Sequence, residues 1–238
     1  KSDDRNGVNV TLSTQNAGWY THYGHDTRYF ADLTLMFSAS NKLDPDSRWL
    51  PAPTVGLSWR ISDEAFMKNQ NVIDFMKLRA SFGIINTDNT PADGYWLNKM
   101  EGGGTYPVVG GNNFGNGDGG WAEVRLTSLN GVLEKAYKYN VGLDMSLLKG
   151  LTFTIDGFYE RRSDIWVSAA GQNSAVLGVG SPYKNAGIVD SWGTEMGLDY
   201  NKRIGDFQLR LGGTFSFNRS EIIENLEEPK AYEYLSAK

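Results

Sequence analysis

Residues Tyr137 to Leu147 have the sequence Tyr-Lys-Tyr-Asn-Val-Gly-Leu-Asp-Met-Ser-Leu, and this stretch decides the fold class. Every odd position carries a large apolar or aromatic side chain, and every even position carries a small or polar one. A strict period of two places these two sets on opposite faces of a β-strand. The alternation resumes from Leu151 to Glu160 after the turn at Leu148 to Gly150. The two runs therefore predict an antiparallel hairpin.

The same alternation occurs along most of the chain. It is found at Tyr29–Ser38, Thr54–Ile61, Lys77–Ile84, Trp192–Asn201 and Gln208–Asn218. The last two segments flank the turn at Lys202 to Asp206 and form a second predicted hairpin. A further strand is expected around Gly18 to Tyr23, which brings the count to about eight. The sequence thus predicts an all-β, antiparallel fold.

Composition narrows the function classes. The chain has 238 residues, 28 of them Gly and 13% aromatic, with no Cys and a formal net charge of -5. The absence of Cys excludes disulfides, thiol nucleophiles and zinc knuckles. The acidic balance and the lack of a Lys/Arg cluster argue against a nucleic-acid partner. No apolar run approaches the roughly 18 residues of a transmembrane helix, whereas alternating strands remain compatible with a membrane β-barrel.

The connections between the predicted strands differ in length at the two ends of the sheet. Short connections are expected at Gly24–Thr27, Leu148–Gly150 and Lys202–Asp206, and a compact one at Ser62–Phe75, with Ser62 as the N-cap of one or two helical turns. Long connections are expected at Asn41–Arg48, Thr87–Leu133 and Ser163–Asn185. Short periplasmic turns and long extracellular loops are typical of outer-membrane barrels.

A soluble β-sandwich that binds carbohydrate through Trp-rich loops is the alternative, because its strands also alternate. Two features favour the membrane barrel. Several runs extend for about 10 residues, the length that a tilted strand needs to cross hydrocarbon. Aromatic residues also gather at strand ends, where their rings lie at the level of lipid headgroups.

Several segments resemble the barrel of SusC/RagA-type TonB-dependent transporters of Bacteroidetes. The resemblance lies in Leu57–Asn69, Leu78–Gly83, Glu134–Asp144, Phe158–Ile165 and Asn185–Leu198, which follow the family's order. It implies an antiparallel transmembrane β-barrel in the bacterial outer membrane, of which this chain supplies about 8 of 22 strands. The family's plug domain, energy-coupling box and C-terminal strands are not recognised within residues 1–238. The whole chain is therefore interpreted as part of one β-barrel domain.

The resemblance also implies a function. Such proteins import an oligosaccharide or peptide nutrient, make or break no bond and need no cofactor. The implied partners are a SusD-like surface lipoprotein, TonB acting through the plug region, and membrane lipid or lipopolysaccharide. A dimer of the transporter–lipoprotein pair is a further implied assembly.

The candidate substrate-binding residues are loop aromatics that can stack on sugar rings or pack on peptide side chains. They are Tyr95, Trp96, Tyr106 and Trp121. The alternative is that they pack the loops against themselves. No metal site is predicted: His22 and His25 fit a surface turn, and the oxygen-rich stretches Asp44–Asp46 and Asn112–Asp118 lack the spacing of an EF-hand.

The charged residues of the strands fall on the face opposite the apolar side chains. They are Asp32, Arg60, Lys77, Arg79, Asp144, Asp156, Glu160, Glu195, Asp199 and Arg210. In a barrel this set lines the lumen, and we expect cross-strand ion pairs that hold water or a plug. A catalytic carboxylate pair that includes Glu160 or Glu195 is the enzymatic alternative.

Overall fold

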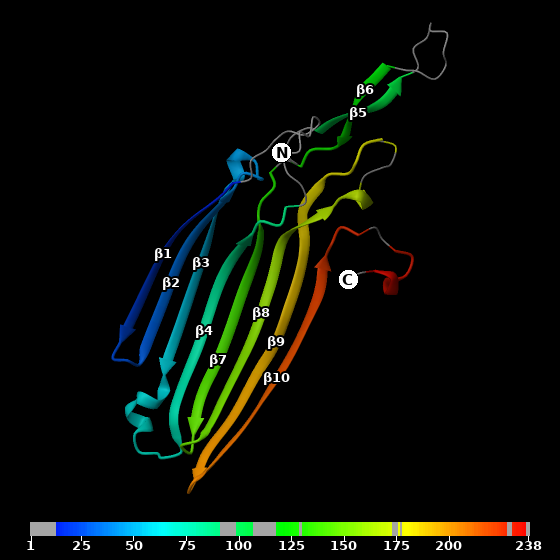
Figure 1. Ribbon diagram of the computed structural model, residues 1–238. Helices are drawn as coiled ribbons and strands as arrows, with labels where there is room; N and C mark the ends of the chain where they lie inside the picture. Colours follow the sequence, from blue (N-terminus) through cyan, green and yellow to red (C-terminus); the bar gives the residue numbers. More distant parts are fainter. Residues whose placement is uncertain are drawn as a thin grey trace.

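The computed structural model describes residues 13–90, 99–106, 118–128, 130–172, 176, 178–227 and 230–236. Eight long strands form one antiparallel sheet in the order β1-β2-β3-β4-β7-β8-β9-β10 (Figure 1). The strands are β1 (Thr14–His25), β2 (Tyr29–Ser40), β3 (Trp49–Arg60), β4 (Ile73–Thr87), β7 (Glu134–Leu147), β8 (Leu151–Ser168), β9 (Tyr183–Ile204) and β10 (Phe207–Glu224). All eight predicted strands and their antiparallel pairing are confirmed.

A separate two-stranded hairpin, β5 (Lys99–Tyr106) and β6 (Asp118–Arg125), stands between β4 and β7 in the chain. Figure 1 shows this hairpin extending beyond the end of the sheet where the long connections lie. The sequence predicted only a loop over Thr87–Leu133. Its glycine-rich stretches carry no period of two, so the alternation that revealed the other strands gave no signal here.

The other end of the sheet is closed by tight connections. Asp26 and Thr27 join β1 to β2, and Leu148 and Lys149 begin the turn from β7 to β8; all four have positive φ. Two consecutive residues with positive φ are the geometry that matches the right-handed twist of a hairpin. The last turn holds only Gly205 and Asp206, because β9 continues to Ile204 and β10 begins at Phe207.

Two predicted connections are corrected. β8 continues to Ser168 and β9 begins at Tyr183, so the loop between them is shorter than the predicted Ser163–Asn185. The compact connection contains two 3-10 turns, η2 (Ile61–Asp63) and η3 (Ala65–Met67), rather than a turn capped by Ser62. Ser62 lies inside η2, and the N-cap positions fall on Arg60 and Glu64.

The strand register places the side chains on two different faces of the sheet. Leu78 pairs with Leu143, Leu143 with Ile155, Ile155 with Met196, and Met196 with Phe215. We call the side that carries this row the apolar face. The neighbouring row, which includes Lys77, Asp144 and Thr154, points to the opposite side, which we call the polar face.

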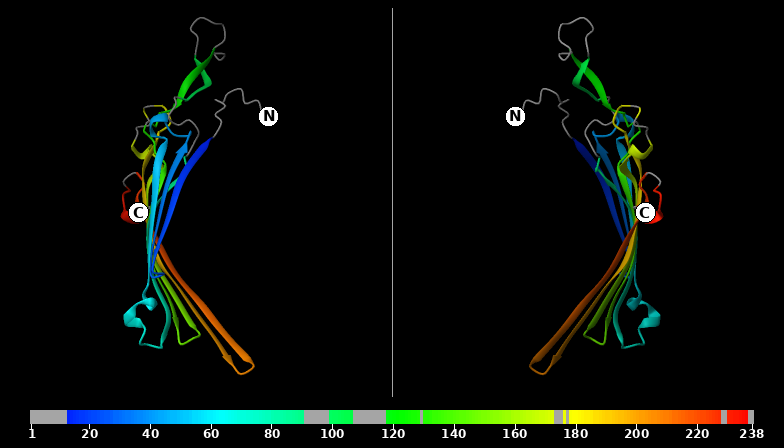
Figure 2. Two further views of the ribbon diagram at one scale, coloured as in Figure 1. Left: turned by 90° about the vertical axis from the view of Figure 1, so that its left-hand side faces the viewer. Right: turned by 90° about the vertical axis from the view of Figure 1, so that its right-hand side faces the viewer.

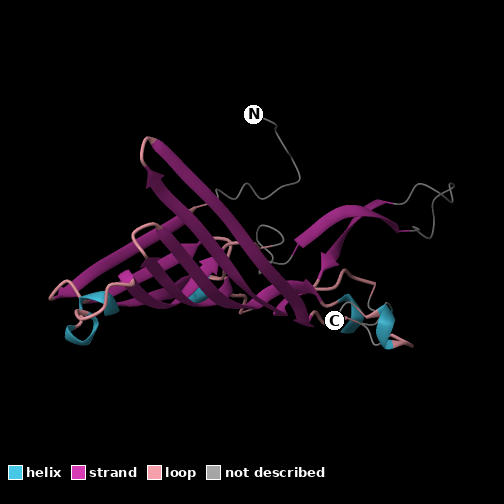
Figure 3. Ribbon diagram, turned by 90° about the horizontal axis from the view of Figure 1, so that it is seen from below, coloured by secondary structure: helices cyan, strands magenta, loops and turns pink. Residues whose placement is uncertain are grey.

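The sheet is a single, strongly twisted layer. Figure 2 shows it edge-on, with β10 crossing obliquely to β1, and Figure 3 shows the strands curving around one side. Leu57, Val141, Leu211 and Phe215 of the apolar face are each more than half exposed. Within the described parts of the chain no second sheet packs on this face, so the β-sandwich alternative is wrong. Such an exposed apolar surface requires a cover other than water.

The buried core is small and lies near the long connections. It consists of Leu43, Leu133 and Trp166, with Leu50 and Tyr183 packed against it. Among the described residues, no helix has the length and apolar character needed to cross a membrane.

Prolines interrupt the pairing of β3 with β4 near the end of the sheet that carries the long connections. The pairing of β3 with β4 stops at Thr54, just beyond Pro53 and Pro51, whose nitrogens cannot donate. The side-chain amide of Asn86 instead donates to the carbonyls of Leu50 and Pro51, at 3.2 and 3.3 Å.

Candidate functional site

The polar face is organised around Arg79. Its Nε and Nη2 donate to Asp144 at 2.7 and 3.0 Å, and Nη2 also donates to Asp156 at 3.0 Å. Arg79 lies on β4, Asp144 on β7 and Asp156 on β8, so the guanidinium joins three strands. A forked guanidinium suits this bidentate geometry, which a Lys ammonium cannot reproduce. We call these three residues the Arg79 network.

Gly142 makes the Arg79 network possible. It pairs with Arg79 on one side and with Asp156 on the other. A Cβ at this position would lie 2.7 Å from Nη2 of Arg79 and would also collide with the Asp156 carboxylate. The absence of a side chain at Gly142 therefore lets the charged side chains of three strands contact one another.

Other predicted members of the inward set also find partners. Asp32 accepts hydrogen bonds from the Tyr20 hydroxyl and contacts His22 Nδ1, both at 2.7 Å. Arg60 pairs with Asp63 at 3.0 Å, and Glu160 pairs with Lys138 at 2.9 Å. Lys77 lies 5.6 Å from the centre of the Phe30 ring. In the described part of the chain no ion pair is found for Glu195, Asp199 or Arg210.

The enzymatic alternative required a carboxylate pair. Glu160 lies opposite Ser191, whereas Glu195 lies opposite Asp156, so the two glutamates are four residues apart along adjacent strands. Glu160 is also neutralised by Lys138. The geometry does not bring Glu160 and Glu195 together as an acid and a base, and Asp156, the carboxylate opposite Glu195, is bound by Arg79.

The long-connection end carries a second polar cluster around Glu134, which is 2% exposed. Its carboxylate accepts from Arg162 Nη2 at 2.9 Å, from the Trp166 backbone nitrogen at 3.4 Å and from Asn89 at 3.5 Å. Glu134 carries no signal of its own in the sequence, because its partners come from distant segments. A nearby hollow of about 270 Å³ is lined partly by Thr127, Trp166 and Tyr183.

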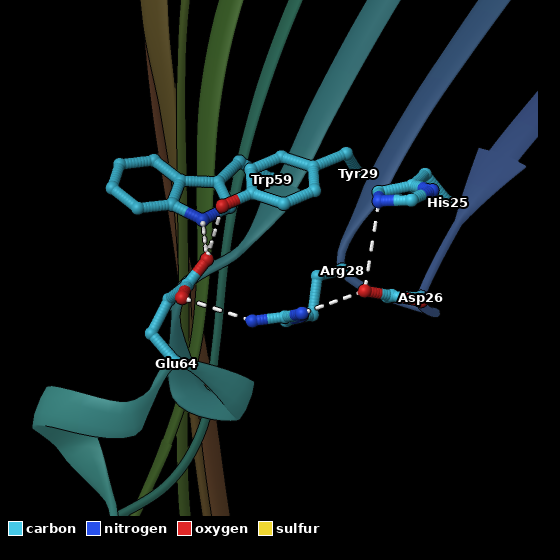
Figure 4. A network of polar contacts seen from close by, with 6 residues as sticks. All are labelled: His25, Asp26, Arg28, Tyr29, Trp59 and Glu64. Atoms are coloured by element: carbon cyan, nitrogen blue, oxygen red, sulfur yellow. Dashed lines mark hydrogen bonds and ion pairs between the residues drawn. The ribbon is translucent and has the colours of Figure 1, made fainter.

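At the short-turn end a carboxylate joins two connections (Figure 4). Glu64 Oε1 accepts from the Tyr29 hydroxyl at 2.5 Å and from Trp59 Nε1 at 3.0 Å, and Oε2 accepts from Arg28 at 3.3 Å. Arg28 also donates to Asp26 at 2.7 Å. We call these five residues the Glu64 network.

The Glu64 network keeps its acids ionised. The pKa of Glu64 is lowered because the Tyr29 hydroxyl, the Trp59 indole and then Arg28 stabilise the carboxylate. The pKa of Asp26 is lowered mainly by its hydrogen bond to Arg28, with a further contribution from His25. The sequence placed Glu64 in the predicted compact connection Ser62–Phe75 but carried no signal for its contacts with Tyr29 and Arg28.

The predicted loop aromatics are placed only in part. Tyr95 and Trp96 lie outside the described residues. Tyr106 is the last residue of β5 and pairs with Asp118, whereas Trp121 lies on β6 opposite Gly102. These two aromatics therefore belong to the hairpin rather than to an irregular loop.

The residues weighed for metal binding have other roles in the structure. His22 and His25 both lie on β1, and their odd spacing places them on opposite faces of the strand. Asp44 accepts a hydrogen bond from the Asp46 nitrogen at 3.2 Å, which caps the 3-10 turn η1 (Pro45–Ser47). Most of Asn112–Asp118 lies outside the described residues.

A single sheet with one exposed apolar face, one ion-paired face and tight turns at one end defines a segment of an outer-membrane β-barrel. The family described as "TonB dependent receptor-like, beta-barrel" matches residues 3–233, and the chain belongs to this family. The chain is therefore part of an outer-membrane protein.

Curated relatives agree with this assignment. The TonB-dependent receptor SusC of Bacteroides thetaiotaomicron is 28% identical over 214 residues, which cover 84% of this chain and 20% of SusC. The TonB-dependent receptor P39 of Formosa agariphila is 26% identical over 221 residues, which cover 88% of this chain and 19% of P39. The chain thus spans about a fifth of the length of these relatives, which are receptors and not enzymes.

Solved structures share the fold. The RagAB peptide importer in its open-open state matches with a TM-score of 0.75 at 18% identity, over 90% of this chain and 22% of that one. The FrpB iron transporter of Neisseria meningitidis matches with a TM-score of 0.54 at 13% identity, over 94% of this chain and 29% of that one. The resemblance to SusC/RagA-type transporters is confirmed for a partial chain.

Proposed function

We propose that this chain is part of the barrel wall of an outer-membrane nutrient importer driven by TonB. The observation that carries the proposal is the opposition of the two faces: exposed leucines, valines and aromatics on one side, and the Arg79 network on the other. Lipid covers the apolar face, and the polar face lines a wet lumen through which a substrate passes. The chain supplies eight of about 22 strands, and residues 1–238 belong to one barrel domain whose plug and C-terminal strands lie elsewhere in the longer protein.

The proposed substrate is an oligosaccharide or a peptide. A lumen lined by Arg79, Lys138, Asp144 and Glu160 is hydrated and offers hydrogen bonds to polar solutes of either class. Tyr95, Trp96, Tyr106 and Trp121 stay the proposed residues for stacking on the substrate. The hollow beside Trp166 and Tyr183 offers further aromatic surface. RagAB, which shares the fold, is a peptide importer.

The proposed partners follow from the family. A SusD-like lipoprotein covers the long connections and delivers substrate, and TonB acts through the plug. Two such transporter–lipoprotein pairs form the proposed dimer.

The test is uptake by cells that lack the gene of the full-length transporter. Complementation with the intact gene should restore growth on one glycan or one peptide mixture as sole nutrient, and removal of TonB should abolish it. Affinity purification of the tagged transporter from outer membranes should recover the lipoprotein. Restored uptake that persists without TonB, or no uptake of either nutrient class, would contradict the proposal.

A further inference from the structure

Two hollows of opposite chemical character meet at the short-turn end of the sheet. The first is an apolar groove of about 360 Å³ on the apolar face, with Tyr23, Tyr29, Ala31, Trp59 and Ala80 among its lining residues. The second is a polar hollow of about 720 Å³, with Asp26, Arg28, Asp63 and Lys68 among its lining residues. The guanidinium of Arg28 lies 5.9 Å from the centre of the Tyr29 ring, so the two hollows adjoin there.

The groove arises from the strand register. Tyr23 pairs with Ala31, Ala31 with Leu57, and Leu57 with Ala80, which forms one row across β1 to β4. Short alanine side chains in this row leave a depression, and the next row supplies the Tyr29 and Trp59 rings as its wall. The rings are stacked with an interplanar angle of 11°. The depression therefore has a flat aromatic side and an aliphatic floor.

The polar hollow carries both signs of charge. Asp26 and Asp63 supply carboxylates, and Arg28 and Lys68 supply cations. The side chain of Asp26 is 55% exposed and that of Arg28 is 31% exposed, so both remain accessible beside their mutual ion pair. Lys68 is exposed as well. A ligand head that carries a phosphate and an ammonium complements this arrangement of two carboxylates and two cations better than a purely anionic head, which offers nothing to the carboxylates.

The placement fits one leaflet of a bilayer. The groove faces the side covered by lipid, and the polar hollow lies beyond the Tyr29 and Trp59 rings, whose polar atoms both point to Glu64 (Figure 4). Tyr and Trp with one wet end and one apolar end are typical of the headgroup level. The groove thus lies at the level of a lipid acyl chain, the Tyr29 and Trp59 rings at the level of the ester region, and the polar hollow at the level of the headgroup.

We propose that this region binds one zwitterionic aminophospholipid of the periplasmic leaflet. An acyl chain occupies the groove over Ala31 and Ala80. Arg28 and Lys68 bind the phosphate, and Asp26 accepts the hydrogen bonds of the ammonium group.

The experiment measures which lipids remain on the protein. The full-length transporter is reconstituted into nanodiscs of equal parts phosphatidylethanolamine and phosphatidylglycerol, and lipids retained after release into the gas phase are counted by native mass spectrometry. We expect phosphatidylethanolamine to exceed phosphatidylglycerol about fivefold, which is the upper end of what one exposed ion pair contributes. Asp26→Asn should reduce this ratio, because the ammonium loses its acceptor.

A groove-filling substitution tests the acyl chain separately. Ala80→Leu adds an apolar side chain on the lipid-covered face, so the barrel should assemble while the groove is filled. It should abolish retention of phosphatidylethanolamine. The matched control is Gly157→Leu, which fills another apolar-face groove, of about 350 Å³, beside Tyr159 and Trp192.

Gly157→Leu should leave the retained ratio unchanged. Equal retention of the two lipids by the unmodified transporter overturns the proposal, as does preference that survives Ala80→Leu. A loss of phosphatidylethanolamine retention that is equally large in Gly157→Leu also overturns the proposal, because the lipid would then be held by the whole apolar face.

Discussion

The hydroxyl of Tyr29 donates a 2.5 Å hydrogen bond to Oε1 of Glu64, although 35 positions separate the two residues in the chain. Tyr29 is the first residue of β2, and Glu64 lies between η2 and η3. The bond therefore fixes the turn before β2 to the connection that follows β3. Because Glu64 must be ionised to accept from three donors at once, the fixation depends on pH.

Acid should release the connection around Glu64. Its pKa is lowered in the folded protein from an ordinary value of 4.5, so its stabilising contribution is fully present above pH 4.5 and is lost as the pH falls through the lower folded pKa. The hydrogen-exchange protection factors of residues 61–72, measured in the full-length transporter, should fall below pH 4.5. Glu64→Gln should exchange faster at neutral pH and lose this pH dependence. An acid response that is identical in Glu64→Gln would assign the effect to another group.

Leu143 and Asp144 should contact different surroundings. The chain has no Cys, so single Leu143→Cys and Asp144→Cys variants can be labelled cleanly, provided that other thiols of the full-length transporter are removed. A lipid-dissolved thiol reagent should modify position 143, and a water-soluble one should modify position 144. Leu143→Arg should impair barrel assembly, because a basic side chain at the lipid midplane costs about 2 to 4 kcal/mol. Water-soluble labelling at position 143 would contradict the assignment of the faces.

Gly142→Ala should destabilise the barrel. The new Cβ collides with the Asp156 carboxylate and approaches Arg79, and such overpacking costs about 1 to 3 kcal/mol. The measurement is the urea midpoint of heat-modifiable migration of the full-length transporter. Gly213→Ala is the matched control, because no atom lies within 4 Å of a Cβ built there. Equal midpoints for the two variants would show that the Arg79 network tolerates the displacement.

The long connections should be accessible from outside the cell. In the segment between β8 and β9 (169–182) and in the segment 88–133, the residues that the structure describes lie at one end of the sheet, opposite the turns at Lys149 and Gly205 (Figure 1). Proteinase K added to intact cells should cleave within the long segments and spare the turns, as mapped by mass spectrometry. Cleavage confined to the turns would reverse the orientation.

The strands could be predicted because the period-two alternation is read from neighbouring residues in the sequence. The same alternation assigned the side chains to the correct faces of the sheet. Arg79, Asp144 and Asp156 were thus placed on one side from sequence, but their meeting depends on the register of three strands and on the missing side chain of Gly142. Glu134 and Asn86 were missed for the same reason, since their partners are distant in the chain. The β5–β6 hairpin was missed because Gly102 to Gly104 interrupt any alternation.

The pairing of β4 with β7 has a consequence for assembly and for evolution. All other neighbours in the eight-stranded sheet follow each other directly in the chain, so they can form as successive local hairpins. Only β4 and β7 must find each other across an intervening segment that includes a complete hairpin. Loop-closure entropy rises only logarithmically with length, by about 0.6 kcal/mol for each doubling. The segment between β4 and β7 can therefore lengthen, shorten or be exchanged at little energetic cost, while the eight-stranded sheet keeps its register.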